Sequence, residues 1–181
     1  MTTLCIDTKK GEMWSDSRAS WNEETGLFSM LTGLNKKFCY EDDTVKIYKL
    51  GDCLVSACGR VSSIEQVLED LKEGKVYNHY YFSGDDAACR VFIMTNETGR
   101  PIVKCYSLIP QKTFVDYLLS LVYIKYKVVV EWHRDCVIFS GSGGVYAKQS
   151  YDEKFDIEHA MYCAKVRDKY SGGDIVCQTL K

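Results

Sequence analysis

Short apolar strands that come in adjacent pairs constrain the fold of this chain more than any other feature. The first pair spans residues 2–8 and 12–20, and the turn between them holds Gly11, which can adopt a positive φ. The order of strands, a helix, strands, two helices and a strand favours antiparallel sheets with helices packed on their outer faces. We therefore predict an α+β layered domain. Further strands are expected at 44–50, 53–59, 87–95, 101–108, 136–139 and 174–180, and helices at 62–73, 145–150 and 156–170.

Two stretches have no simple assignment. Residues 21–43 are expected to form a loop or irregular excursion. Residues 113–132 are ambiguous, because their first half could line a helix whereas 126–132 looks extended. The first helix is expected to be capped by Ser62 or Ser63.

Composition and charge exclude several classes of function. The 181 residues suit one domain, and a net charge of −2 without a basic stripe gives no reason to expect a nucleic-acid partner. The nine cysteines include no Cys-x2-Cys pair, so we expect no metal site and no cofactor, but reduced thiols in a cytoplasmic protein, several of them buried on strands. The polar N-terminus does not resemble a signal peptide. The longest apolar stretch, 114–132, is interrupted by four charges, so no membrane partner is expected.

The first residues offer one catalytic possibility. If Met1 is removed, Thr2 carries a hydroxyl and an α-amine whose ordinary pKa of about 7.7–8.0 makes it a usable base near neutral pH. A threonine activated by its own N-terminal amine is a recognised nucleophile. A retained Met1 acylates that amine and removes the base. Many chains begin Met-Thr, so this start carries weight only in combination with other motifs.

Five segments, in order, carry a resemblance to a known family. They are Thr2-Thr3-Leu4, the 14–20 run Trp-Ser-Asp-Ser-Arg-Ala-Ser, Thr44-Val45-Lys46-Ile47, the 141–147 run Gly-Ser-Gly-Gly-Val-Tyr-Ala, and the 167–173 run Arg-Asp-Lys-Tyr-Ser-Gly-Gly. In order and rough spacing they resemble the matching segments of proteasome β subunits and of HslV. The resemblance implies a four-layer αββα sandwich, the N-terminal nucleophile (Ntn) hydrolase fold, spanning 1–181.

The resemblance also implies a role for each residue around the nucleophile. Thr2 would attack through its hydroxyl, and a nearby Lys46 ammonium would stabilise the alkoxide and lower the pKa of the amine. Asp16 would pair with Lys46, and the backbone N–H of Gly59 would face the developing oxyanion. Ser142, Asp168 and Ser171 match polar residues that orient the amine.

Each of these residues also has a structural interpretation. Lys46 could be the polar member of an alternating strand, and Asp16 an ordinary turn or cap residue. Ser142 could cap a helix, and Asp168 and Ser171 could simply end one. The three histidines at 79, 133 and 159 have no partner pattern, so we expect ordinary surface or core positions for them.

Departures from the family pattern are informative. Thr2 lies fourteen positions before Asp16, two fewer than the family has; since strand side chains alternate with period 2, this loss keeps both side chains on their faces. Counting from Met1 would flip one strand, so Thr2 is the first residue of the pattern. The second of two family helices after the Lys46 hairpin looks lost or shrunken, and residues 109–133 look inserted.

These observations leave three hypotheses for function. The first is a proteasome-like threonine endopeptidase that cleaves polypeptide within a homo-oligomeric ring, with an ATPase unfoldase as a further partner. The second is a catalytically silent assembly or interaction protein on the same fold. The third is an Ntn amidase acting on a small substrate.

Overall fold

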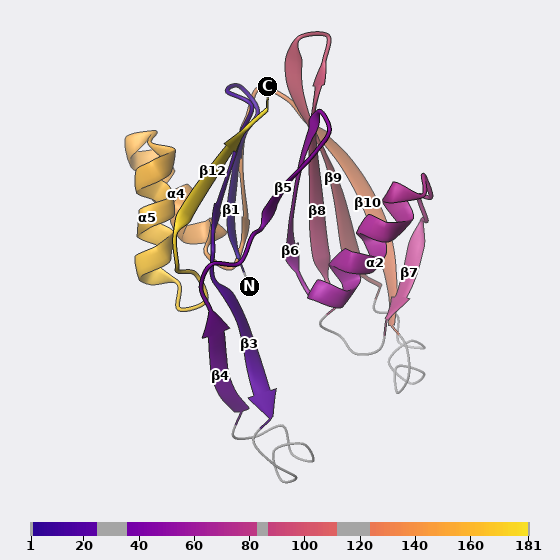
Figure 1. The fold of residues 1–181 in the computed structure, drawn as a ribbon, viewed down its shortest axis with the longest axis horizontal. Helices are drawn as coiled ribbons and strands as arrows, with labels where there is room; N and C mark the ends of the chain where they lie inside the picture. Colours follow the sequence, from indigo (N-terminus) through magenta and orange to yellow (C-terminus); the bar gives the residue numbers. More distant parts are fainter. Residues whose placement is uncertain (1, 25–35, 83–86, 112–123, 181) are drawn as a thin grey trace.

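The computed structural model describes residues 2–24, 36–82, 87–111 and 124–180. In these ranges two antiparallel sheets pack face to face, and helices cover the outer face of each (Figure 1). The predicted α+β class and the four-layer αββα arrangement are confirmed. None of the helices in the described ranges is long and apolar enough to cross a membrane. The helices are α2 (Val61–Lys72) on the second sheet, and α4 (Gly144–Lys154) and α5 (Ile157–Arg167) on the first.

The first sheet has the strand order β11-β1-β2-β12 and is covered on both faces. Every residue of β1 is therefore buried. Successive side chains of a strand point to opposite faces, so Leu4 and Ile6 enter the core between the sheets while Cys5 packs with Ile157 and Met161 of α5. The strands are β1 (Thr3–Asp7), β2 (Glu12–Asp16), β11 (Val137–Gly141) and β12 (Ile175–Thr179).

The second sheet has the order β5-β6-β8-β9-β10-β7, and every pairing in it is antiparallel. Strand β10 pairs with β9 on one side and β7 on the other, so the extended interpretation of 126–132 is confirmed. Residues 112–123 lie outside the described residues, and the assignment of 109–133 as an insertion stays a prediction. The strands are β5 (Ile47–Leu50), β6 (Cys53–Gly59), β7 (His79–Phe82), β8 (Cys89–Glu97), β9 (Arg100–Pro110) and β10 (Ile124–His133).

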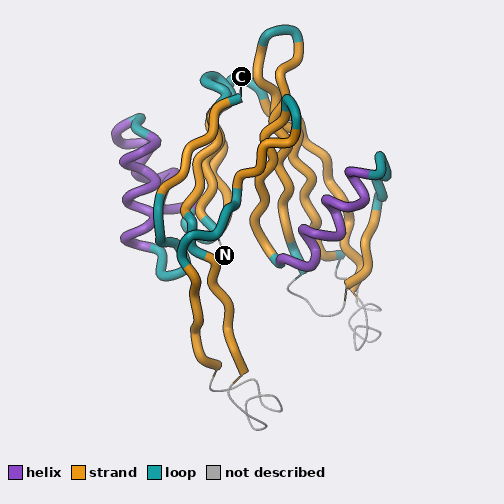
Figure 2. The backbone as a smooth tube through the Cα atoms, in the orientation of Figure 1, coloured by secondary structure: helices purple, strands orange, loops and turns teal. Residues whose placement is uncertain are grey.

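The prediction of an irregular excursion at 21–43 is wrong, because most of this region belongs to a two-stranded hairpin. Strands β3 (Ala19–Glu24) and β4 (Lys36–Glu41) pair with each other and project from the layered body (Figure 2). The predicted second strand, 12–20, is thus divided after Asp16 into β2 and β3. Local pattern could not reveal this hairpin, because its two strands stabilise each other across residues 25–35, which lie outside the described residues.

Two local predictions are wrong. The strand expected at 44–50 begins only at Ile47. Residues 44–46 instead lie against the junction between β2 and β3, where the Thr44 N–H donates to the Ser17 carbonyl (2.8 Å). The N-cap of α2 is Arg60, without a side-chain cap, rather than Ser62 or Ser63. Ser63 lies inside the helix, fully buried.

Between β6 and β8, the part of the chain that the structure describes contains one helix, α2, where the family that the sequence resembles has two.

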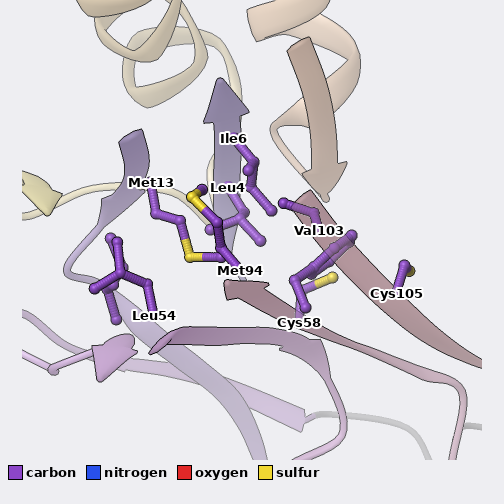
Figure 3. Close-up of a cluster of buried hydrophobic side chains, with 10 residues drawn as sticks. Leu4, Ile6, Met13, Leu54, Cys58, Met94, Val103 and Cys105 are labelled. Carbon is purple, nitrogen blue, oxygen red and sulfur yellow. The ribbon is translucent and has the colours of Figure 1, made fainter. Parts of the chain in front are cut away.

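The main core lies between the two sheets (Figure 3). Leu4, Ile6 and Met13 of the first sheet pack against side chains of the second. A second cluster of nine buried residues lies between the second sheet and α2, and smaller clusters lie under α4 and α5. Beneath α5 the predicted stripe of Ile157, Met161 and Ala164 is buried. The second-sheet members of the main core are Ile47, Leu54, Cys58, Phe92, Met94, Val103 and Cys105.

Candidate active site

Asp16 and Lys46 form a buried ion pair at the end of β2. The Lys46 ammonium donates to Asp16 Oδ1 at 2.9 Å and also to the carbonyl of Arg18. The two side chains are only 8% and 2% exposed. Burial lowers the pKa of the Lys46 ammonium, against the opposing effect of the Asp16 carboxylate. The sequence-predicted partnership of these two residues is therefore present, with the lysine just before its strand instead of on it.

The same carboxylate holds the beginning of the chain. The backbone N–H of Thr3 donates to Asp16 Oδ1 at 2.7 Å, and the N–H of Gly172 donates to Oδ2 at 3.0 Å. Lys46 and Thr3 thus share one carboxylate oxygen. Thr2, joined to Thr3 by the peptide bond that supplies this N–H, is brought beside the lysine and is itself buried. Met1 lies outside the described residues.

A second set of hydrogen bonds links the three polar residues predicted near the C-terminal end of the chain. The hydroxyls of Ser142 and Ser171 both donate to Asp168 Oδ2, at 2.6 and 2.7 Å. Since the only proton of the Ser171 hydroxyl goes to Asp168, the Thr3 hydroxyl must be the donor in its own short contact with Ser171 Oγ. Asp168 holds this position because it is the C-cap of α5. The network reaches Thr3, the neighbour of Thr2, and sequence reasoning missed this residue.

Two glycines mark close backbone approaches, one to Thr2 and one to Ala88. Gly141 has a φ of +83°, and a Cβ at this position would lie 1.7 Å from the Thr2 carbonyl oxygen. Gly59 ends β6 with a φ of +124°, and its Cβ would lie 2.4 Å from the Ala88 carbonyl oxygen. Only glycine fits either position. The positive φ that each requires was not visible in the sequence.

The predicted oxyanion glycine lies near the same end of the sandwich. Cys58 Sγ lies 3.1 Å from Ser140 Oγ, which brings β6 against β11. Gly59 and Gly141 each follow one of these two residues, and Thr3 pairs with Gly141 in the β1–β11 ladder. Gly59 is exposed, so its backbone is open to solvent. The role of its N–H stays a prediction.

Arg18 is a further residue at this site that sequence reasoning did not single out. Its guanidinium makes two hydrogen bonds to the Asp42 carboxylate, at 2.7 and 3.0 Å, and lies 4.1 Å from the centre of the Tyr40 ring. A Cβ on Gly172 would lie 2.3 Å from the Arg18 guanidinium carbon. Arg18 therefore joins the β3–β4 hairpin to the loop that carries Ser171, while its carbonyl accepts from Lys46.

Comparison with solved structures identifies proteins of the same architecture. Eukaryotic HslV from Trypanosoma brucei is 14% identical, with a TM-score of 0.52 over 99% of both chains. BPH from Thiobacillus denitrificans, solved in complex with epoxomicin, is also 14% identical, with a TM-score of 0.51 over 99% of this chain and 100% of that one. No family model matches the sequence, and neither does any curated protein.

The chain has the fold of HslV. The family resemblance drawn from five short motifs is thus confirmed at the level of fold, over nearly the whole chain. The structure brings Asp16 and Lys46 together in one group, and Ser142, Asp168 and Ser171 in another. Thr3 contacts both groups, through its N–H and its hydroxyl respectively.

Proposed function

We propose that this protein is a threonine-type endopeptidase whose nucleophile is Thr2, exposed as the N-terminal residue when Met1 is removed. The observation that carries the proposal is the shared oxygen of Asp16, which accepts from both the Lys46 ammonium and the Thr3 N–H. This arrangement holds a buried cation beside the first residues of the chain. A buried ammonium stabilises a developing alkoxide more strongly than an exposed one, because the surroundings screen it less.

The chemistry follows from these groups. The Thr2 amine takes the proton of the Thr2 hydroxyl while its oxygen forms a bond to the carbonyl carbon of a peptide. The resulting oxyanion accepts from the Gly59 N–H. When the C–N bond breaks, the proton passes from the Thr2 amine to the leaving nitrogen, and an ester on Thr2 remains. Water, deprotonated by the same amine, then hydrolyses the ester and restores the hydroxyl.

The polar network supports this cycle indirectly. Asp168 accepts from Ser142 and Ser171, so these hydroxyls are held in fixed positions next to Thr3. In the proposal, Ser142 and Ser171 orient the free amine of Thr2 once Met1 is removed. A surface hollow beside Lys46, bordered by residues 43–47 and by Asp174, Val176 and Gln178, is a candidate position for part of the substrate.

The fold also suggests how the activity is confined. The family resemblance implies a homo-oligomeric ring acting on unfolded polypeptide in the cytoplasm, and because HslV is among the structural neighbours, this ring is part of the proposal. An ATPase unfoldase is the partner that such a ring would need for folded substrates. Light scattering on the purified protein tests the ring: a mass of several protomers supports it, and a monomer at micromolar concentration contradicts it.

Mass spectrometry of the protein from its native host provides the decisive experiment. We expect a species without Met1 that gains the mass of epoxomicin, the ligand bound in the Thiobacillus denitrificans complex, with the adduct on Thr2. Thr2→Ala should lower peptide hydrolysis by about 10³-fold or more. Thr179→Ala, which removes an exposed hydroxyl on β12, is the matched control and should remain active. Complete retention of Met1 would favour the silent assembly protein, whereas full activity of Thr2→Ala would contradict Thr2 as the nucleophile.

A further inference from the structure

Two neighbouring strands of the second sheet bring together three different metal-binding side chains. Cys105 of β9 pairs directly with Glu131 of β10, and His133 lies two residues further along β10 on the same face. Directly opposed residues of an antiparallel pair share a face, so all three point toward the first sheet. Cys105 marks the border of the core between the sheets (Figure 3).

From this juxtaposition we infer that Cys105, Glu131 and His133 bind a divalent transition-metal ion of the zinc class. One donor atom from each residue lies within 4.8 Å of the other two. Tetrahedral zinc, with bonds of about 2.0–2.3 Å, holds its ligands roughly 3.5 Å apart. Small rotations of the exposed Glu131 and the half-buried His133 close this difference, while the buried Cys105 stays fixed.

The donor set selects the metal. Thiolate, imidazole and carboxylate are the three ligand types that zinc uses in proteins, whereas magnesium and calcium require oxygen ligands. Three protein ligands leave the fourth tetrahedral position to water. Ser107, two residues from Cys105 on the same face, lies with its Oγ 3.4 Å from Cys105 Sγ. A hydroxyl in this position can donate to a metal-bound thiolate and fix its orientation.

The site has no short sequence signature. Its cysteine and its histidine are far apart in the chain, and the sequence predicts neither a metal nor a partner for His133. The sheet register supplies that partner. A metal ion bound here would link β9 to β10 within the second sheet. The inference is independent of the proposed peptidase activity.

Cobalt binding by the full-length, reduced protein tests the inference. Co²⁺ replaces zinc in such sites, and its bond to a thiolate produces an intense near-ultraviolet absorption that carboxylate and imidazole ligands alone do not. We expect one equivalent of Co²⁺ to bind with this absorption, and Zn²⁺ to displace it. Cys105→Ser should abolish the absorption. Glu131→Gln and His133→Gln should each weaken Co²⁺ and Zn²⁺ affinity at least tenfold.

Cys163→Ser is the matched control. Cys163 Sγ lies 3.5 Å from His159 Nε2 on α5, so this pair is the alternative source of a cysteine and a histidine. The control should keep the full signal. An absence of Co²⁺ binding at 0.1 mM (about the concentration of an ordinary titration) overturns the inference, as does a signal that survives in Cys105→Ser or disappears in Cys163→Ser. If Cys105→Ser does not fold, the substitution of the exposed Glu131 decides the question: unchanged Co²⁺ affinity in Glu131→Gln overturns the inference.

Discussion

Replacing Asp16 by Asn should destabilise the protein more strongly than most single substitutions. The Asp16 side chain is 2% exposed, and its carboxylate accepts three hydrogen bonds, two at Oδ1 from Thr3 and Lys46 and one at Oδ2 from Gly172. Asparagine has almost the same shape but only one acceptor oxygen. In either orientation of the amide, its NH2 group faces at least one donor, and Lys46 loses its buried counter-ion.

The magnitude follows from these losses. An unsatisfied buried donor costs about 1–3 kcal/mol, and breaking a buried ion pair by neutralising one partner costs about 3–5 kcal/mol in total. The Arg18 carbonyl still accepts from Lys46, so we place Asp16→Asn near 3 kcal/mol. With a denaturant slope of about 2 kcal/mol per molar urea, the unfolding midpoint should fall by roughly 1.5 M.

Urea unfolding followed by tryptophan fluorescence measures this shift. Asp42→Asn is the control, because Asp42 also pairs with a cation, Arg18, but its side chain is 36% exposed and surface ion pairs contribute little. Its midpoint should stay close to that of the wild type. A shift for Asp16→Asn no larger than that for Asp42→Asn would refute the conclusion that the buried carboxylate organises this end of the sandwich.

Three further predictions concern a backbone contact, a buried hydroxyl and a thiol. Gly141→Ala should cost about 3 kcal/mol or more in urea unfolding, because its Cβ would overlap the Thr2 carbonyl; Gly51→Ala, with a φ of +58° and open space, should cost only about 1 kcal/mol. Ser63→Ala should stabilise by about 1 kcal/mol, since within the described residues the buried Ser63 hydroxyl has no hydrogen-bond partner; destabilisation would contradict this. Burial raises the pKa of the Cys89 thiol from 9.0 to about 12, so its contribution to stability is present below pH 9 and is lost between pH 9 and 12. The slope of unfolding free energy against pH in that range should be shallower in Cys89→Ala.

The sequence was most informative where chemistry depends on local pattern. Short apolar runs beside turn residues predicted β1 and β6. A stripe of apolar residues at helical spacing predicted α5, because burial on one face repeats with the period of the helix. Five short motifs in the right order predicted the fold, which the structural neighbours confirm. The Asp16–Lys46 partnership was also predictable, through the resemblance.

Tertiary structure decided which distant segments meet. Lys46 precedes its strand because residues 44–46 lie against the β2–β3 junction. The β3–β4 hairpin forms because residues 19–24 pair with residues 36–41, which are separated from them by eleven residues of the chain. Thr3 acquired two partners, Asp16 and Ser171, from opposite ends of the chain. Sheet register placed Cys105 opposite Glu131. Local pattern specifies how often a side chain faces the core, whereas pairing and register depend on the energy of the whole packed arrangement.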